Sequence, residues 1–303
     1  MTQGQAARGH LVERAMGRMP GFENDGVAGA AQENEPAPPI SAAPSPVLER
    51  PKPAAPTTRR AIDLGLLHAA GLVMLPDKTR RNRVLEELAM VRQQVLRGVD
   101  SAAPDPRRAR IVLIASALPL EGKSFIALNL AASMARSGAR HVVLIDADGR
   151  SGSMTDLLGT GGMPGLRDLV TEPDWLPAQM LLPTAIDRLR FLPHGKADAT
   201  GQAPPAGSTM AAAIERLATS RPDHVLVIDS PPCLSTSDCS ALAPVAGQVV
   251  LVVDAERTLR NEVEAALDVL EACPVLQLLL NRLRLTVNDT FGARGDYGAA
   301  NAD

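Results

Sequence analysis

The segment IVLIASALPLEGKS, residues 111–124, carries the strongest structural signal in the sequence. An apolar strand runs into a turn, and a helix is predicted to begin near Lys123. Gly122-Lys123-Ser124 at such a junction indicates a P-loop, because backbone N–H groups and the helix N-terminus hold phosphate oxygens. We expect Lys123 to contact nucleotide phosphates and the Ser124 hydroxyl to ligate Mg²⁺. Ala117 replaces the first glycine of the motif, and the alternative is a chance triplet that caps a helix.

Two further predicted strands end in acids. Val142–Asp146 is followed by Asp148, and Val225–Asp229 is followed by Ser-Pro-Pro. Because the carboxyl ends of strands in a parallel α/β sheet border the ligand crevice, we expect these acids near the nucleotide. Asp146 and Asp229 are candidate Mg²⁺ ligands. The alternative interpretation makes one or more of the acids a cap of a turn or helix.

The other polar candidates carry weaker signals. Asn281 follows the predicted strand Leu276–Leu280, so its amide either reads an adenine edge or ends a strand as a turn residue. Arg150 pairs either with the acids or with phosphate. The histidines have no metal-ligand spacing and are interpreted as surface or strand-edge residues; they are His10, His68, His141, His194 and His224.

Apolar runs and helical patterns alternate from residue 110 to about residue 281. The predicted strands are Ile111–Ala115, Val142–Asp146, Leu189–Leu192, Val225–Asp229, Val249–Val253 and Leu276–Leu280. The predicted helices are Leu85–Leu96, Ser124–Arg136, Met210–Ala218 and Arg260–Ala272. This βαβ alternation predicts an α/β domain with a doubly wound, mostly parallel sheet.

The sequence predicts four parts along the chain. Residues 1–60 form a Pro/Ala-rich segment that we expect to be a disordered tether, since it has little apolar surface to bury. Residues 61–107 form a basic, helical lead-in whose cluster Lys78–Arg83 is either a solvated face or a contact for acidic groups. Residues 108–285 form the nucleotide-binding domain, and residues 286–303 form a flexible tail.

Composition excludes several classes of function. Aromatic residues make up 2% of the 303 residues, which is too few for a platform that stacks nucleic-acid bases. The net charge of −3 provides no global field for DNA, so we expect no nucleic-acid partner. No apolar run approaches the ~20 residues of a membrane span, and residues 1–13 lack the apolar region of a secretion signal. We therefore expect a cytoplasmic protein.

Several blocks together resemble the bacterial tyrosine autokinases of exopolysaccharide loci, the CpsD/CapB-type P-loop kinases, and above all their exosortase-associated branch. The matching blocks are residues 116–131, 144–148, 165–169, 224–232, 247–253 and 280–281. The resemblance implies ATP and Mg²⁺ as cofactors and phosphoryl transfer to tyrosines of a C-terminal tail, in trans within a ring. It also implies a membrane partner, a Wzz-like chain-length determinant that holds the kinase at the inner membrane.

The resemblance assigns roles to individual residues. It implies that nucleotide contacts come from Glu121, Gly122, Lys123, Ser124, Phe125 and Asn281. It implies Mg²⁺ ligation by Ser124, Asp146 and Asp229. Catalysis would rest on Lys123, with Asp146 or Asp148 orienting or deprotonating the incoming tyrosine hydroxyl. The chain has one tyrosine, so Tyr297 is the predicted phosphoacceptor.

Four features depart from the family pattern. Leu120 stands where the family has glycine, which stiffens the loop. Gly149 and Ser151-Gly152 replace an apolar residue and Arg-Pro, which loosens that loop. Ala89 replaces the middle arginine of a helical oligomerisation motif that retains Glu86 and Arg92. The tail retains only Tyr297, with Phe291 where a second tyrosine is expected.

Three hypotheses follow. The leading one is an ATP- and Mg²⁺-dependent tyrosine autokinase that regulates exopolysaccharide synthesis. The second, motivated by Ala89 and the single tyrosine, is a nucleotide-dependent switch ATPase with little kinase activity. The third is a partition or positioning ATPase, which the absence of a lysine from residues 116–119 disfavours.

Overall fold

The computed structural model describes residues 60–73, 83–100, 105–138, 140–172, 174–195 and 207–283. The chain divides into two units, Met1–Pro53 and Ala54–Asp303, and every described residue lies in the second. The predicted N-terminal tether up to residue 59, most of the basic cluster Lys78–Arg83, and Tyr297 lie outside the described residues.

A seven-stranded sheet forms the centre of the described part, with strand order β3-β4-β2-β5-β1-β6-β7. Its strands are β1 (Ile111–Ser116), β2 (His141–Asp146), β3 (Leu182–Pro183), β4 (Leu189–Leu192), β5 (His224–Asp229), β6 (Gln248–Asp254) and β7 (Leu276–Asn281). Neighbouring strands run parallel throughout, except that β3 is antiparallel to β4. The predicted doubly wound, mostly parallel sheet is therefore confirmed.

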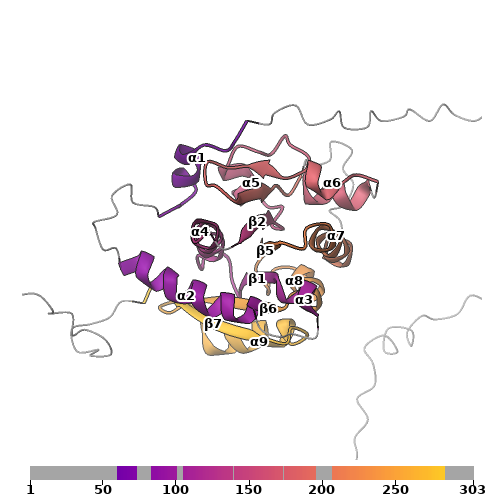
Figure 1. Cartoon of the computed structure of the whole chain (residues 1–303). Helices are drawn as coiled ribbons and strands as arrows, with labels where there is room; N and C mark the ends of the chain where they lie inside the picture. Colours follow the sequence, from indigo (N-terminus) through magenta and orange to yellow (C-terminus); the bar gives the residue numbers. More distant parts are fainter. Residues whose placement is uncertain are drawn as a thin grey trace, which may run out of the picture. The chain divides into compact units, whose positions relative to one another are not determined.

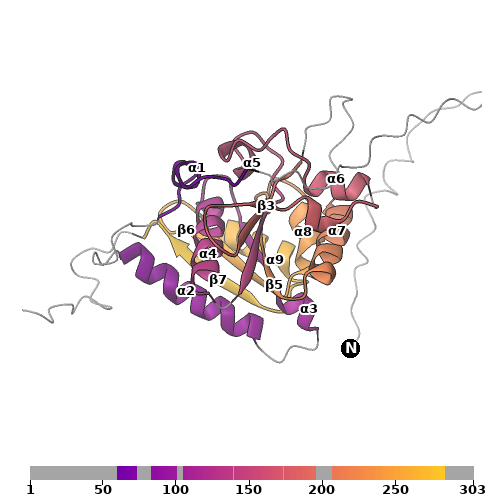
Figure 2. The same cartoon turned by 45° about the horizontal axis from the view of Figure 1, so that its top comes forward.

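Helices cover both faces of this sheet (Figures 1 and 2). They are α1 (Leu64–Ala69), α2 (Arg83–Asp100), α3 (Pro106–Ala109), α4 (Lys123–Arg136), α5 (Met154–Leu157), α6 (Leu166–Thr171), α7 (Gly207–Ser220), α8 (Asp238–Leu242) and α9 (Arg260–Leu270), with 3-10 turns η1 (Pro177–Gln179) and η2 (Ala243–Val245). Pro106 begins α3, because proline at the first helical turn loses no hydrogen bond.

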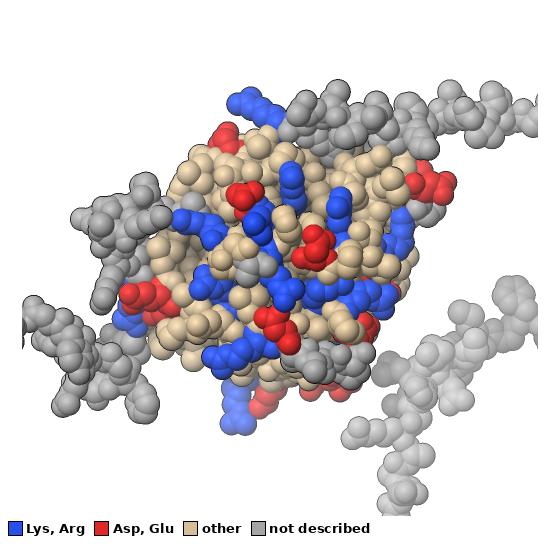
Figure 3. Space-filling view, viewed as in Figure 1, with Lys and Arg blue, Asp and Glu red and all other residues tan. Residues whose placement is uncertain are grey.

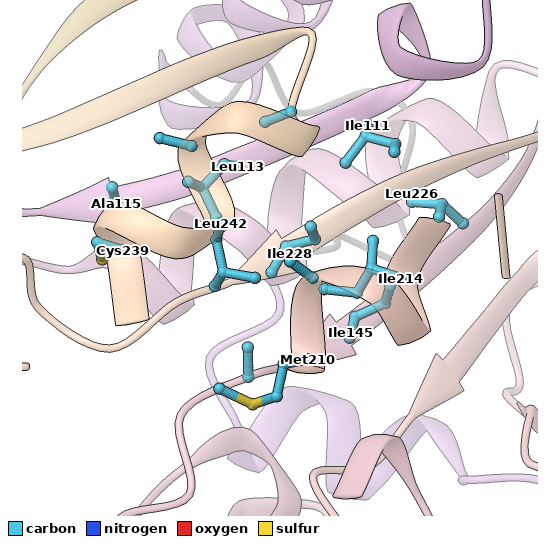
Figure 4. Packing of buried hydrophobic residues seen from close by; sticks show 14 of the residues in the cluster. Ile111, Leu113, Ala115, Ile145, Met210, Ile214, Leu226, Ile228, Cys239 and Leu242 are labelled. Carbon is cyan, nitrogen blue, oxygen red and sulfur yellow. The ribbon is translucent and has the colours of Figure 1, made fainter. Parts of the chain in front are cut away.

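Side chains alternate along each strand, so the core has two halves. On β1, Ile111 and Leu113 point to the half built with α6, α7, α8 and α9, whereas Val112 and Ile114 point to the half built with α1, α2 and α4. Figure 4 shows the first half, where Ile214 of α7 and Leu242 of α8 pack on β1 and β5. Aliphatic side chains dominate both halves, as the low aromatic content requires.

The basic lead-in is part of this core. Leu88 and Val95 of α2 are buried in the same half as α4, and Ile62 pairs with Thr184 in an isolated bridge. Helix α2 is longer than predicted, because its apolar face continues to the buried Val99. Burial of this face stabilises the helix, since most helical stability in proteins comes from the packing of an amphipathic face.

Arginines fasten the amino ends of the strands. Arg110 donates to the carbonyls of Arg221 and His224 at 3.0 and 2.9 Å, and Arg108 donates to those of Ala246 and Ala272. Basic side chains also gather on the face that Figure 3 shows. These two arginines are thus engaged with the backbone, and their role is structural.

Among the described helices, none is both long enough and apolar enough to cross a bilayer.

Candidate nucleotide and phosphoryl-transfer site

The loop between β1 and α4, where a phosphate site is predicted, holds two residues with a positive φ. Gly122 caps α4 with φ +94°, and Leu120 has φ +68° with its side chain 78% exposed. A positive φ disfavours any residue with a Cβ, so Leu120 occupies a conformation that suits glycine. The glycine expected from the family pattern at this position therefore matches the backbone.

Asn281 supports the loop from β7. Its Nδ2 donates to the carbonyl of Glu121 at 2.8 Å, and a Cβ placed on Gly122 would lie 2.2 Å from the same nitrogen. Gly122 is thus required both by its φ and by the close approach of Asn281. Because this amide binds the loop backbone, the predicted contact between Asn281 and adenine stays a prediction.

Glu121 braces the loop from inside. Its carboxylate is 3% exposed; Oε2 accepts from the N–H of Leu118 at 2.8 Å, and Oε1 accepts from the hydroxyl of Thr258. Thr258 follows β6, so one buried side chain ties the loop to the neighbouring strand end. The family resemblance implies a nucleotide contact for Glu121, which stays a prediction. The sequence gives no signal for Thr258, which lies 137 residues away.

Lys123 lies between two acids. Its Nζ is 3.1 Å from Oδ1 of Asp229 and 3.5 Å from Oδ2 of Asp148, and it donates to the hydroxyl of Ser124 at 3.4 Å. Burial opposes the ammonium charge, but the two carboxylates outweigh burial and raise the pKa of Lys123. The sequence predicts these four residues as a group, and the fold brings them together.

Asp229 is fully buried at the end of β5, and so is Asp146, which lies beside it in register on β2. Burial raises its pKa to about 6, with Asp146 adding to the effect and Lys123 opposing it. Its Oδ2 is buried and accepts no hydrogen bond from any described residue.

Asp148 is held by two cations. Arg150 donates to Oδ1 from Nε at 2.8 Å and to Oδ2 from Nη2 at 2.7 Å, a bidentate pair. Burial raises the pKa of Asp148, but Arg150 and Lys123 outweigh it and lower the pKa overall. Asp148 is consequently a carboxylate that stays ionised beside Lys123.

Asp146 has a different environment, although it is only two residues away. Its Oδ1 accepts from the N–H of Asp148 at 2.9 Å and its Oδ2 from the N–H of Thr155 at 2.7 Å. Burial raises its pKa against these bonds. In the free protein Asp146 therefore shapes the loop from residue 147 to residue 155, which agrees with the alternative that one of the acids is a cap.

His194 is a residue that the sequence interpretation missed. Strand β4 ends two residues before it, and its imidazole occupies the space beside Gly149, where an added Cβ would lie 2.5 Å from Nε2. We expect Gly149 to loosen its loop, because it replaces an apolar residue of the family pattern. In the structure, His194 fills the space that such a side chain would occupy. Its position just after a strand end was the available signal.

Phe125 lies one residue beyond the P-loop triplet. It packs, partly buried, against the half of the core that holds α2 and α4. Its Cδ2 is 3.4 Å from where a Cβ on Gly71 would be. Its predicted nucleotide contact stays a prediction.

Comparison with known proteins identifies several relatives. The chain is 34% identical over 163 residues to a tyrosine-protein kinase, Wzc, of Salmonella typhimurium, covering 52% of this chain and 21% of Wzc. It is 35% identical over 201 residues to a succinoglycan biosynthesis transport protein, ExoP, of Rhizobium meliloti, covering 63% and 24%. It is 31% identical over 192 residues to the tyrosine-protein kinase CpsD of Streptococcus agalactiae, covering 62% and 80%.

The matches differ in how much of each relative they span. The chain covers about a fifth to a quarter of Wzc and ExoP, and most of CpsD. Among solved structures, the kinase domain of the Escherichia coli tyrosine kinase ETK aligns with a TM-score of 0.56 at 20% identity, covering 74% of this chain and 92% of that domain. This likeness supports the fold. No family model matches the chain.

Proposed function

The chain belongs to the bacterial tyrosine-protein kinases of the CpsD type, and from that premise we propose that it is an ATP- and Mg²⁺-dependent tyrosine autokinase that regulates exopolysaccharide synthesis. The observation that carries the proposal is the placement of Lys123 at the start of α4, within 3.5 Å of both Asp229 and Asp148. In P-loop enzymes a lysine at this place contacts the β- and γ-phosphates, and neighbouring acids hold Mg²⁺.

The residues at this site fit a nucleotide with Mg²⁺. The unpartnered Oδ2 of Asp229 is a buried carboxylate oxygen that lacks a donor, and Mg²⁺ or its bound water would satisfy it. The Ser124 hydroxyl lies beside Lys123 as a second oxygen ligand. The loop backbone around Gly122 supplies N–H groups for phosphate. A cavity of about 410 Å³ is lined by Pro119, Leu120 and residues 122–125, and it also touches Asp148.

We derive the following roles for the chain's own residues. Bound Mg²⁺ would neutralise phosphate charge. Lys123 would exchange its contact with Asp229 for the transferring phosphoryl group and stabilise its charge. Asp148, kept ionised by Arg150, would orient the tyrosine hydroxyl. Asp146 would hold the intervening loop in place through the N–H groups of Asp148 and Thr155.

The chemical balance of the transfer is simple. The phenolic oxygen forms a bond to the γ-phosphorus of ATP, and the bond from that phosphorus to the β-phosphate oxygen breaks. ADP keeps the electron pair, and the phenolic proton is released to water. Tyr297 is the acceptor because the chain has no other tyrosine.

A link to polysaccharide export is part of the proposal. ExoP, by its name, is a succinoglycan biosynthesis transport protein. By this likeness, the partner of the present chain is a membrane protein of the chain-length-determinant type, which would hold the kinase at the inner face of the membrane. Co-purification of such a protein with the full chain, in an ATP-dependent manner, is the test of this part.

Incubation with ATP and Mg²⁺ followed by phosphopeptide mapping tests the kinase activity. We expect phosphate on Tyr297 in the wild-type chain and none in Lys123→Met. Arg136→Met, at the other end of α4, is the matched control and should leave labelling unchanged. Nucleotide turnover with an unmodified Tyr297 would contradict the autokinase proposal.

That outcome would favour the nucleotide-dependent switch ATPase. The surroundings of Ala89 and Arg92 on α2 support this second candidate. Ala89 lines a hollow of about 310 Å³ between α2 and α4. Arg92 donates within the chain to the Oγ of Ser133 at 3.1 Å. A helix whose family motif lacks its central arginine, and whose next basic residue is already engaged, is poorly equipped for ring assembly. The switch hypothesis would be supported if the Tyr297→Phe variant sustained full exopolysaccharide synthesis while the Lys123→Met variant no longer bound the membrane partner.

A further inference from the structure

Strand β7 has an open backbone edge. It is the last strand in the order of the sheet, so only its β6 side is paired within the described part of the chain. The carbonyls of Val275 and Asn281 accept hydrogen bonds from the β6 side, at 2.8 and 3.0 Å. In a parallel ladder the N–H and C=O of one residue point to the same side, and the side alternates along the strand. The backbone groups that point to the open edge are therefore those of Leu276, Leu278 and Leu280.

The same leucines also present apolar side chains to solvent. Leu278 and Leu280 are 58% and 60% exposed, and Leu276 is 38% exposed. Leu278 lies in register with Leu251 of β6, and Leu280 lies in register with Val253. Both β6 residues are buried in the half of the core that includes α9, so this cover stops at β6. Proteins usually cover such an edge, because it can pair with other chains.

The chain turns directly after β7. Arg282 has φ +59°, and a residue in this left-handed region is a common part of hairpin loops. Its Nη1 donates to Oδ2 of Asp254 at 2.7 Å, and its N–H donates to Oδ1 of Asn281 at 2.9 Å. These bonds fix the turn at the carboxyl end of β7. Leu283, which is 55% exposed, is the last residue that the structure describes, so the rest of the tail starts beside the open edge.

The sequence after this turn has the pattern of a strand. Residues 283–287 read Leu-Arg-Leu-Thr-Val, in which apolar residues at 283, 285 and 287 alternate with polar residues at 284 and 286. A period of two with one apolar face is typical of a half-buried strand, and Val and Thr are enriched in strands. Asn-Asp follows at residues 288–289, and both types are depleted in strands. The segment is therefore about as long as the edge that it would cover.

We propose that residues 284–287 fold back along the open edge of β7 as an additional, antiparallel strand. The register pairs Leu280 with Leu285 and Leu278 with Val287, across a four-residue loop that includes Arg282 and has a usual hairpin length. This register gives the N–H groups of Leu278 and Leu280 acceptors. It also places four apolar side chains together on the face that α9 covers at β6. The proposal does not depend on the proposed kinase function.

The chain's own tail is favoured over a second copy as the occupant. The tail is joined to β7 through a short loop, so its docking pays only the small entropy of closing that loop. A second copy of the chain would also pay for lost translational and rotational freedom. The alternation at residues 283–287 further matches the apolar row of β7, with one apolar residue opposite each of Leu278 and Leu280.

Docking of this strand would change the reach of Tyr297. Fourteen residues separate Tyr297 from Leu283, whereas ten separate it from Val287. At no more than about 3.6 Å per residue, the longest reach falls from about 50 Å to about 36 Å. The anchor also moves from the carboxyl end of β7 to a point opposite Leu278. The docked strand therefore restrains the tyrosine of the tail, and its release lengthens the tether.

Amide hydrogen exchange of the full chain, followed residue by residue by NMR, tests the docking. We expect the N–H groups of Leu278 and Leu280 to exchange about tenfold more slowly in the wild-type chain than in Val287→Pro, which removes a bonded N–H from the proposed strand. Thr286→Pro is the matched control. In this register the N–H of residue 286 points away from β7, so exchange should stay within about twofold of wild type. The N–H of Leu279 points to β6 and should stay protected in all three chains.

Equally fast exchange of Leu278 and Leu280 in the wild-type and Val287→Pro chains would overturn the proposal. Protection that survives Val287→Pro and falls on dilution would also overturn it, because a second copy would then be the occupant. A nuclear Overhauser effect between the Hα atoms of Leu279 and Thr286, which face each other closely in this register, should locate the strand. Its absence in a chain with protected Leu278 and Leu280 would exclude the tail. None of these measurements needs phosphate transfer, so failure of the kinase proposal leaves the test intact.

Discussion

Gly122→Ala is expected to lower the free energy of unfolding through two effects that add together. An L-residue at φ +94° pays about 1–2 kcal/mol for the left-handed conformation. The new Cβ would also lie 2.2 Å from Nδ2 of Asn281, which must move and give up its 2.8 Å bond to the carbonyl of Glu121. Loss of that bond costs about 0.5–1.5 kcal/mol, so we expect a total of roughly 2–3 kcal/mol.

Two other glycines separate the two effects. Gly138 has φ +77° but no atom within 4 Å of a built Cβ, so Gly138→Ala should cost only the conformational part, about 1–2 kcal/mol. Gly162 has an ordinary φ and open space, so Gly162→Ala should be neutral or stabilise by up to about 1 kcal/mol. Urea unfolding followed by the fluorescence of Trp175, the chain's single tryptophan, measures all three. A cost for Gly122→Ala no greater than that for Gly138→Ala would refute the role assigned to Asn281.

Three further predictions concern the same region. Leu120→Gly relieves a φ of +68° at an exposed side chain and should raise the free energy of unfolding by about 0.5–1 kcal/mol, measured by urea unfolding. The control Leu176→Gly, at φ −77°, should lower the free energy of unfolding. Glu121→Ala leaves the Leu118 N–H and the Thr258 hydroxyl without an acceptor and should cost about 2–4 kcal/mol. Glu271→Ala, on the exposed surface, should change stability little, and equal effects would contradict the bracing role. Asp229 has a folded pKa of about 6, above its unfolded value of 3.8, so the folded protein binds the extra proton and stability falls as the pH rises from about 4 to about 6. Asp229→Asn should remove up to about 3 kcal/mol of that fall, and an unchanged pH slope of the urea midpoint would show that Asp229 is ionised throughout.

The P-loop and the three acids were predictable because their signals are local. A buried strand, a turn and Gly-Lys-Ser follow one another within a few residues, and parallel strands deliver their carboxyl ends to one edge of the sheet. The same logic predicted that Lys123, Asp148 and Asp229 would meet, and their distances confirm that they do.

Other features depend on contacts between distant residues. Which of Asp146 and Asp148 faces Lys123 is decided by the N–H of Thr155, nine residues beyond Asp146. The pairing of Gly149 with His194 and that of Glu121 with Thr258 join residues that are far apart in the sequence, with several strands and helices between them, so no local pattern predicts these contacts. Strand β3 has only two residues, too few for a periodic signal.

The lead-in, residues 61–107, shows what a helical pattern can and cannot predict. The apolar spacing of α2 predicted a helix but not where its apolar face would be buried. Leu88 and Val95 are buried against α4 of the same chain. An amphipathic pattern indicates that a face is covered, and only the three-dimensional structure identifies what covers it.

Transfer of phosphate from the Lys123 site to one tyrosine can be measured by the intact mass of the full chain after incubation with ATP and Mg²⁺, for wild type, Lys123→Met and Tyr297→Phe. We expect the addition of a single phosphate to the wild-type chain and of none to either variant. Phosphate retained by Tyr297→Phe, or an unchanged wild-type mass while ATP is consumed, would contradict it.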